Sequence, residues 1–284
     1  MKAYLFPGQG VQCVGMGRAL YDASASMRAR FHQADRLLAM KLTDLMFNGP
    51  ADALKETIVA QPAIFLCSIL LAETLPFPPA AVAGHSLGEL TALVASKFLS
   101  FEDGLALIAI RARAMQEACH ALPGTMAAVL GLEDEAIEAI CASIVDEIVV
   151  PANYNCPGQL VISGSKAGVA RATKALLQAG ARRVIALEVE GGFHSPLMEM
   201  AKDPLRKALA SISFSKGICP IYQNVSGLPT TDPETIKKQL VEQLVAPVYW
   251  TNTIHCMTKN GIAECMESGP GNVLTRLVQK IGTH

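Results

Sequence analysis

The stretch Ala80-Ala81-Val82-Ala83-Gly84-His85-Ser86-Leu87-Gly88-Glu89 joins a short apolar segment to a Gly-His-Ser-Leu-Gly turn. We expect a strand over 80–83, a helix from Glu89, and Ser86 at the apex between them. Gly-x-Ser-x-Gly is typical of the sharp strand-to-helix turn that lifts a nucleophilic serine above a sheet edge, where side chains on the glycines would collide with backbone. An ordinary tight turn is the alternative reading. The context, a strand before and a helix after, favours a nucleophile at Ser86.

The flanking sequence predicts more units of the same kind. A strand is expected over 3–6, then a Gly-rich loop and a helix from about Arg18; a second helix should begin at Gln61-Pro62 and end before Pro76. Alternating strands and helices indicate a largely parallel sheet with helices on both faces. The fold class is therefore α/β, with an α/β-hydrolase-like main domain.

The middle of the chain has a different order of predicted elements. Four strands and two helices are expected there, in the order β-α-β-β-α-β, over 125–131, 133–144, 147–153, 159–164, 166–179 and 183–189. This order is the split pattern of a ferredoxin-like unit. We therefore expect an inserted ferredoxin-like small subdomain at 125–189, within an α/β-hydrolase-like core formed by 1–124 and 190–284.

Composition excludes several classes of protein. The 284 residues are 51% hydrophobic and 17% charged, with a net charge of −1, which argues against disorder and against a nucleic-acid or membrane-surface partner. The apolar run 63–72 is shorter than the roughly 20 residues that a membrane span needs. Pro7-Gly8 interrupts any signal-peptide pattern, so we expect a cytoplasmic protein. The eight cysteines lack zinc-type spacing, so we expect reduced, mostly buried thiols and no metal.

A serine nucleophile needs a base, and the sequence offers six histidines. His194 lies in Gly191-Gly192-Phe193-His194-Ser195-Pro196, a Gly-rich loop expected directly after a strand, and is our predicted base. His255, in a predicted helix, is the second candidate. His85 adjoins Ser86 but should point elsewhere, His32 fits a surface helix, and His284 is the last residue. No acid between Ser86 and His194 is singled out as a third member.

The amino-terminal end of the helix predicted after Ser86 is expected to stabilise an oxyanion. Its first amides and the positive end of its dipole point toward the turn. The backbone N–H of Leu87 is therefore the expected oxyanion donor.

Arg111 stands where an apolar residue belongs. On the helix predicted over 104–118 it shares a face with small and apolar residues, whereas Arg113 falls on the opposite, polar face. A buried guanidinium needs an anion, and its fork suits a carboxylate. We expect Arg111 to receive a carboxylate of an acyl substrate; an internal carboxylate partner that holds the fold is the alternative.

With Ser86, His194 and Arg111 assembled, the chain closely resembles the malonyl-CoA:acyl carrier protein transacylases, including freestanding acyltransferases of polyketide synthases. The resemblance covers essentially the whole length. Its landmarks are Gly8-Gln9-Gly10-Val11-Gln12, Gly84-His85-Ser86-Leu87-Gly88-Glu89, Arg111 with Met115-Gln116, Asn153-Tyr154-Asn155-Cys156-Pro157-Gly158-Gln159, Phe193-His194-Ser195, Pro247-Val248-Tyr249-Trp250 and Gly269-Pro270-Gly271.

The resemblance implies further roles. Gln9 would give the second oxyanion N–H, and the backbone carbonyl of Gln243, rather than an acid, would orient His194. Asn155 would lie near the substrate pocket, and Phe193 belongs to the malonyl-selecting form of its loop. Malonyl-CoA would be the substrate and an acyl carrier protein the acceptor, with no bound cofactor. Departures from the family pattern are Ala112, Glu190 and the segment 123–126.

Basic residues gather between Lys166 and Leu187, where no acidic residue occurs. Because carrier proteins are generally acidic, we expect Arg171, Lys174, Arg182 and Arg183 to contribute to a docking surface; a merely solvated face is the alternative.

Three rival functions remain open at the level of sequence. A thioester hydrolase or esterase is one, although Arg111 argues against it. A dinucleotide-binding module is a second, but Gly8-x-Gly10-x-x-Cys13 lacks the third glycine. The third is a catalytically inactive carrier-protein scaffold, against which the complete set of Ser86, His194 and Arg111 argues.

Overall fold

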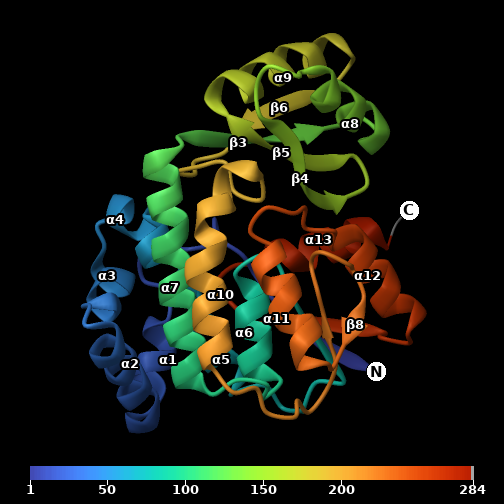
Figure 1. The fold of residues 1–284 in the computed structure, drawn as a ribbon. Coiled ribbons are helices and arrows are strands. Elements are labelled where there is room, and N and C mark those ends of the chain that lie inside the picture. The colour runs from blue at the N-terminus through green and yellow to red at the C-terminus, as the bar shows by residue number, and fades with distance from the viewer. Residues whose placement is uncertain (283–284) are drawn as a thin grey trace.

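The computed structural model describes residues 1–282 and contains a mainly parallel sheet and an antiparallel sheet (Figure 1). Thr283 and the histidine candidate His284 lie outside the described residues, so the predicted segment 190–284 is described as far as Gly282. Within residues 1–282, no helix has the length and apolar character needed to cross a membrane.

The mainly parallel sheet carries the Ser86 turn. Among the described residues its strand order is β8-β7-β2-β1-β9, and only the β7–β8 pair is antiparallel. The strands are β1 (Lys2–Phe6), β2 (Ala81–Gly84), β7 (Ile221–Tyr222), β8 (Pro229–Thr230) and β9 (Glu264–Glu267). The central strands β1 and β2 are almost entirely buried, because helices cover both faces of the sheet.

Alternation along β1 separates the two faces. Tyr4 and Phe6 join a large core cluster, whereas Ala3 and Leu5 join a smaller cluster on the other face. The helices of the larger cluster are α1 (Arg18–Ala23), α2 (Ala25–Leu38), α3 (Leu42–Asn48), α4 (Ala51–Lys55), α5 (Thr57–Ala72), α6 (Gly88–Ala95), α7 (Phe101–Ala121), the 3₁₀ helix η1 (Pro196–Ala201), α10 (Lys202–Ser211) and α11 (Pro233–Glu242). The smaller cluster is covered by α12 (Trp250–Lys259) and α13 (Val273–Ile281).

The antiparallel sheet has the strand order β4-β5-β3-β6. Its elements, in chain order, are β3 (Gly124–Leu130), α8 (Asp134–Ser143), β4 (Val149–Cys156), β5 (Gln159–Ser165), α9 (Lys166–Gln178) and β6 (Arg183–Ala186). Ala127 and Val129 face α8 and α9, whereas Met126 and Ala128 turn to the large core. The sheet therefore packs by its second face onto the rest of the molecule, below it in Figure 1.

Several predicted boundaries were wrong: strand β4 spans Val149–Cys156 rather than 147–153, and helix α7 spans Phe101–Ala121 rather than 104–118. Helix α5 begins at Thr57, not at Gln61, so Pro62 lies inside the helix. Its early amides are satisfied by distant side chains: Glu190 accepts from the Thr57 N–H at 2.8 Å, and Gln116 accepts from the Ile58 N–H at 3.0 Å. Such caps from other elements leave no local signal in the sequence.

The last strand of the antiparallel sheet is also shorter than predicted. Strand β6 ends at Ala186 instead of 189, because the chain leaves the sheet edge to contact α4 and α5. Glu188 pairs with Lys55 at 2.9 Å, and Glu190 caps α5. His194 therefore follows an irregular segment rather than coming directly after a strand.

Candidate active site

The turn between β2 and α6 places Ser86 at the carboxyl end of the parallel sheet. Ser86 has φ 54°, a left-handed conformation that non-glycine residues rarely adopt outside functional sites. The flanking glycines have no room for a side chain: a Cβ at Gly84 would lie 1.9 Å from the carbonyl carbon of Gly88, and one at Gly88 would lie 2.1 Å from the carbonyl oxygen of Phe6. Both glycines are therefore required by close backbone contact, as their positions in the motif predicted.

Asn224 braces this turn. Its Oδ1 accepts from the Ser86 N–H at 2.7 Å, and its Nδ2 donates to the Gly84 carbonyl at 2.6 Å. The side chain is fully buried, just after β7, the neighbour of β2. Sequence reasoning missed Asn224, because only the strand order brings residues 138 positions apart in the chain together.

His194 lies against the serine. The distance from Ser86 Oγ to His194 Nε2 is 2.8 Å, and the imidazole is 3% exposed. Its Nδ1 is 2.8 Å from the carbonyl oxygen of Gln243, which can only accept, so Nδ1 carries the proton and Nε2 is free to accept from the serine hydroxyl. Burial and the nearby positive charge of Arg111 lower the pKa of His194 to about 3. The ring is therefore neutral at physiological pH, the state that a base requires.

Arg111 points into the same space from α7. The side chain is 2% exposed, whereas Arg113 on the same helix is exposed, as the helical pattern predicted. Its Nη2 donates to Ser86 Oγ at 3.1 Å and to Gln243 Oε1 at 2.9 Å, and its Nη1 donates to Gln61 Oε1 at 2.6 Å. None of the ion pairs within 4.0 Å in residues 1–282 involves Arg111, so neutral amides, not a carboxylate, hold the guanidinium.

The remaining predicted site residues surround this centre. Leu87 precedes α6 directly after the serine, and Phe193 precedes His194 and is 6% exposed. Gln9 donates to Thr57 Oγ1 at 3.3 Å, and Asn155 Oδ1 lies 2.9 Å from His85 Nε2. The oxyanion and substrate roles of these residues stay predictions.

A cavity of about 160 Å³ adjoins the turn, between the first loop, the antiparallel sheet and α13. Its lining includes Gln9, His85 and Asn155, as well as Leu187 and Leu274. The structure thus brings Gln9 and Asn155 to one cavity. His255, the second candidate for the base, is exposed on α12 and does not line this cavity.

Two further polar residues in the site were missed at the level of sequence. Gln61 of α5 holds the Arg111 guanidinium, and Glu89 in the first turn of α6 accepts from the Gln243 side chain at 2.5 Å. Each is fully buried within an apolar segment. The same reasoning that singled out Arg111, a polar group among apolar neighbours, would have found both.

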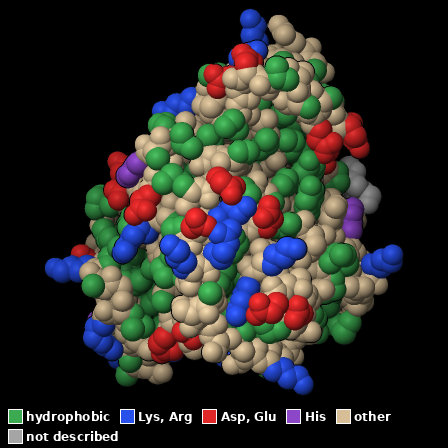
Figure 2. Space-filling view, viewed as in Figure 1, with side chains coloured by type: hydrophobic (Ala, Val, Ile, Leu, Met, Phe, Trp, Pro, Cys, Tyr) green, Lys and Arg blue, Asp and Glu red, His purple; other side chains and the backbone are tan. Residues whose placement is uncertain are grey.

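The basic residues predicted to dock a partner do not form one surface at the site. Arg171 and Lys174 lie on α9, on the side of the antiparallel sheet away from the main sheet (Figure 1), and Arg171 is paired with Asp146. Arg182 and Arg183 border a separate cavity with Leu130, where β6 begins. Elsewhere, on the face that carries α10 and α11, positive and negative side chains are interspersed (Figure 2).

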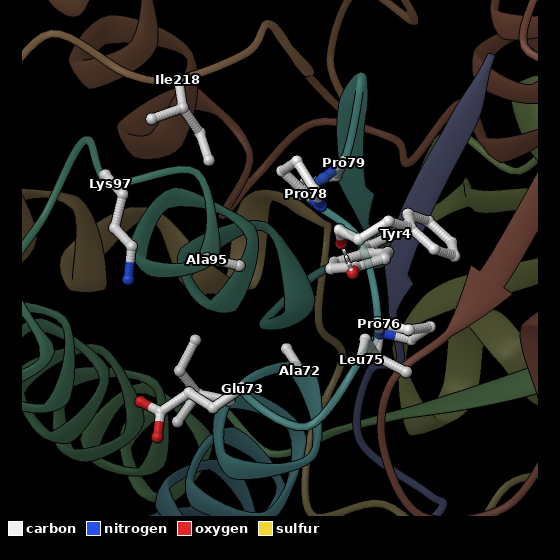
Figure 3. A pocket seen from close by; sticks show the side chains of 12 residues that line it. Tyr4, Ala72, Glu73, Leu75, Pro76, Pro78, Pro79, Ala95, Lys97 and Ile218 are labelled. Atoms are coloured by element: carbon white, nitrogen blue, oxygen red, sulfur yellow. Dashed lines mark hydrogen bonds between the residues drawn. The ribbon is translucent and has the colours of Figure 1, made fainter.

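A cavity of about 330 Å³ lies away from these residues, at the opposite end of the parallel sheet (Figure 3). Tyr4 and the prolines that precede β2 form one side, and Lys97 and Ile218 lie on the other. It contains none of the predicted site residues.

A serine held in a strained turn after a parallel strand, with a neutral histidine in contact with its hydroxyl, is typical of the class of α/β enzymes that work through a serine nucleophile. The acyl transferase domain family matches residues 3–283. The chain belongs to this family, among the malonyl-CoA:acyl carrier protein transacylases.

The relatives cover nearly the whole chain. A malonyl CoA-acyl carrier protein transacylase of Bacillus subtilis (strain 168) is 41% identical over 284 residues, 98% of this chain and 90% of the relative. The protein of the same name from Escherichia coli (strain K12) is 39% identical, over 98% and 92%. A malonyl-transacylase solved in complex with a type II PKS acyl-carrier protein superposes with a TM-score of 0.95 at 37% identity, over 99% of this chain and 93% of that one.

Proposed function

We propose that the protein moves a malonyl group from malonyl-CoA, through an ester on Ser86, to the phosphopantetheine thiol of an acyl carrier protein in fatty acid or polyketide synthesis. The observation that carries the proposal is the contact of Arg111 Nη2 with Ser86 Oγ at 3.1 Å. It places a buried cation next to the atom that would bear the acyl group. The distal carboxylate of a malonyl group matches that charge, and an acetyl group has none.

The first half-reaction uses the hydrogen bonds described above. His194 Nε2 takes the proton of Ser86 Oγ as that oxygen attacks the thioester carbon, and the Gln243 carbonyl stabilises the charged ring that forms. The N–H groups of Leu87 and Gln9 would stabilise the oxyanion. When the C–S bond breaks, His194 returns the proton to the CoA thiolate.

The second half-reaction reverses these steps with a new thiol. His194 deprotonates the phosphopantetheine thiol, its sulfur attacks the Ser86 ester, and the Ser86 oxygen leaves and takes the proton back. No atom or electron is left over, so no cofactor is required by this sequence of steps. Malonyl-CoA is the substrate and the carrier protein the acceptor.

Arg111 has donors to offer the malonyl carboxylate. The guanidinium has five N–H groups, of which three are engaged by Gln61, Gln243 and Ser86 Oγ. The Ser86 contact is lost when that oxygen becomes an ester, and the released Nη2 donor faces the acyl group. Phe193 and Asn155 would complete the pocket, in the malonyl-selecting form of the loop.

The carrier protein would approach beside the antiparallel sheet. We infer that this sheet and its helices are a ferredoxin-like subdomain at 125–189, inserted into an α/β-hydrolase-like core of 1–124 and 190–284; the strand order β4-β5-β3-β6 supports this division. Of the four basic residues proposed for docking, Arg182 and Arg183 are better placed than Arg171, whose charge Asp146 offsets, and Lys174 on the outer helix. A cytoplasmic location fits these substrates.

The test is to follow the acyl group. Wild-type protein mixed with malonyl-CoA should gain one malonyl group by intact-mass analysis and lose it to added holo-carrier protein. Ser86→Ala should not be labelled, and an S86A protein that still carries malonate would refute the assignment. Release of free malonate, faster than transfer to the carrier, would instead identify a hydrolase.

A further inference from the structure

A fully buried carboxylate lies behind the active site. Glu89 is 0% exposed in the first turn of α6, three residues after Ser86. None of the ion pairs within 4.0 Å in residues 1–282 includes it. Instead it accepts from Gln223 Nε2 at 3.0 Å, from Gln243 Nε2 at 2.5 Å and from the Asn224 N–H at 3.3 Å. Burial of an ionised carboxylate costs free energy, so a carboxylate at this position beside the nucleophile is expected to have a specific role.

The Gln243 side chain connects this carboxylate to Arg111. The NH₂ group of the amide faces Glu89, which accepts from it at 2.5 Å, and it also donates to the Ser86 carbonyl at 3.1 Å and to Asn224 Oδ1 at 3.2 Å. An ionised carboxylate, like these two oxygens, can only accept. The amide oxygen therefore faces the other way, where it accepts from Arg111 Nη2 at 2.9 Å. If the amide turned over, its NH₂ group would oppose the guanidinium, and two donors would meet.

We propose that Glu89 is a positioning residue, whose carboxylate fixes the orientation of the Gln243 amide and thereby holds the Arg111 guanidinium beside Ser86. The proposal rests on the proposed function, in which Arg111 receives the malonyl carboxylate. It makes the preference for a dicarboxylic acyl group depend on a residue that touches neither the substrate nor the reacting atoms.

Electrostatics support the same arrangement. Burial raises the pKa of Glu89 to about 7, while its hydrogen-bond donors and the positive charge of Arg111 act to lower it. In turn, burial lowers the pKa of Arg111 to about 10, and the negative charge of Glu89 opposes that shift. Each group thus stabilises the charged form of the other across the Gln243 amide.

A structural alternative makes a different prediction. Glu89 also holds the segment Gln223-Asn224, and Asn224 braces the Ser86 turn. If this were its whole role, loss of the carboxylate would disturb the nucleophile itself, and acyl-enzyme formation would fall equally for every acyl group.

The first test is Glu89→Gln, which keeps the side-chain size but replaces one acceptor with an NH₂ group. Loss of a hydrogen bond to a charged group lowers a rate or binding constant by roughly tenfold to a hundredfold. We expect single-turnover malonyl loading to fall about tenfold to a hundredfold more than acetyl loading, with the larger change in the KM for malonyl-CoA. Thr91→Val is the matched control, because Thr91 is a buried polar residue of the same helix with an unpartnered hydroxyl, and it should leave the malonyl-to-acetyl ratio at its wild-type value. A wild-type ratio in E89Q would overturn the proposal.

A second variant tests the connection without touching the carboxylate. Gln243→Met keeps the backbone carbonyl that contacts His194 but removes the amide between Glu89 and Arg111. It should lower the malonyl-to-acetyl ratio in the same direction as E89Q, and equal losses for the two acyl groups would overturn the proposal even if E89Q did not fold. If the proposed function itself were wrong, the outcome would differ from both of these, because wild-type protein would acquire no malonyl group on Ser86.

Discussion

If Arg111 receives the malonyl carboxylate as proposed, its replacement by alanine should remove most of the preference for malonyl over acetyl groups. The side chain is 2% exposed and its Nη2 lies 3.1 Å from Ser86 Oγ. R111A removes the only guanidinium that contacts Ser86 within residues 1–282, while the Ser86–His194 hydrogen bond involves no Arg111 atom. The chemical step should therefore survive better than recognition of the carboxylate.

The size of the effect follows from the number of bonds lost. A fork that grips a carboxylate makes two charge-assisted hydrogen bonds, each worth about 1.5–3 kcal/mol. Their loss amounts to about 3–6 kcal/mol, or roughly 10²–10⁴-fold in kcat/KM for malonyl loading. Acetyl loading, which lacks these bonds, should change far less.

Folding must be separated from recognition. R111A leaves the amide oxygens of Gln61 and Gln243 without their donor, and a buried unsatisfied acceptor destabilises by about 1–3 kcal/mol. Thermal unfolding of R111A should thus shift to lower temperature. The ratio of malonyl to acetyl loading cancels any loss of folded protein, because both substrates sample the same folded fraction.

The assay is single-turnover loading followed by intact-mass analysis, with the two CoA thioesters tested side by side. Arg113→Ala is the matched control, an exposed arginine two residues away on the same helix, and should leave the ratio unchanged. Equal losses for the two substrates in R111A would refute a carboxylate-binding role and leave Arg111 as a structural residue.

Other parts of the site make separate predictions. Because the pKa of His194 is lowered to about 3, the base is already neutral well below pH 6.5; acetyl loading should show no acidic limb near pH 6.5 in stopped-flow measurements, and such a limb would contradict this environment. Gly88→Ala places a Cβ 2.1 Å from the Phe6 carbonyl oxygen, so thermal melts should reveal destabilisation of about 1–3 kcal/mol or more; a wild-type melting temperature would argue against this tight turn. Charge reversal at Arg182 and Arg183 should raise the KM for carrier protein in a salt-dependent way, while malonyl loading from CoA is unaffected. If the KM for carrier protein responds neither to the charge reversal nor to salt, these residues are not part of the docking surface.

Local patterns predicted the elements around Ser86 well. The apolar segment before Gly84 and the helix after Ser86 are encoded in adjacent residues, and the structure differs by only one residue at each boundary. The burial of Arg111 followed from helical spacing alone, because apolar neighbours three and four residues away fix the face of the helix.

Features that depend on contacts between distant segments were not predictable in this way. The start of α5 at Thr57 depends on Glu190 and Gln116, which lie far along the chain. Asn224 reaches the Ser86 turn because β7 pairs with β2, a register that no local signal specifies. Gln61 and Glu89 could have been found, since each is a polar side chain in an apolar run, but their partners could not.

The most direct measurement is a crystal structure of the wild-type protein trapped after reaction with malonyl-CoA and before transfer. It should contain a malonyl ester on Ser86 Oγ, with the distal carboxylate within hydrogen-bonding distance of the Arg111 guanidinium. An acyl group on any other residue, or a malonyl carboxylate pointing into solvent while Arg111 contacts only Gln61 and Gln243, would contradict the account.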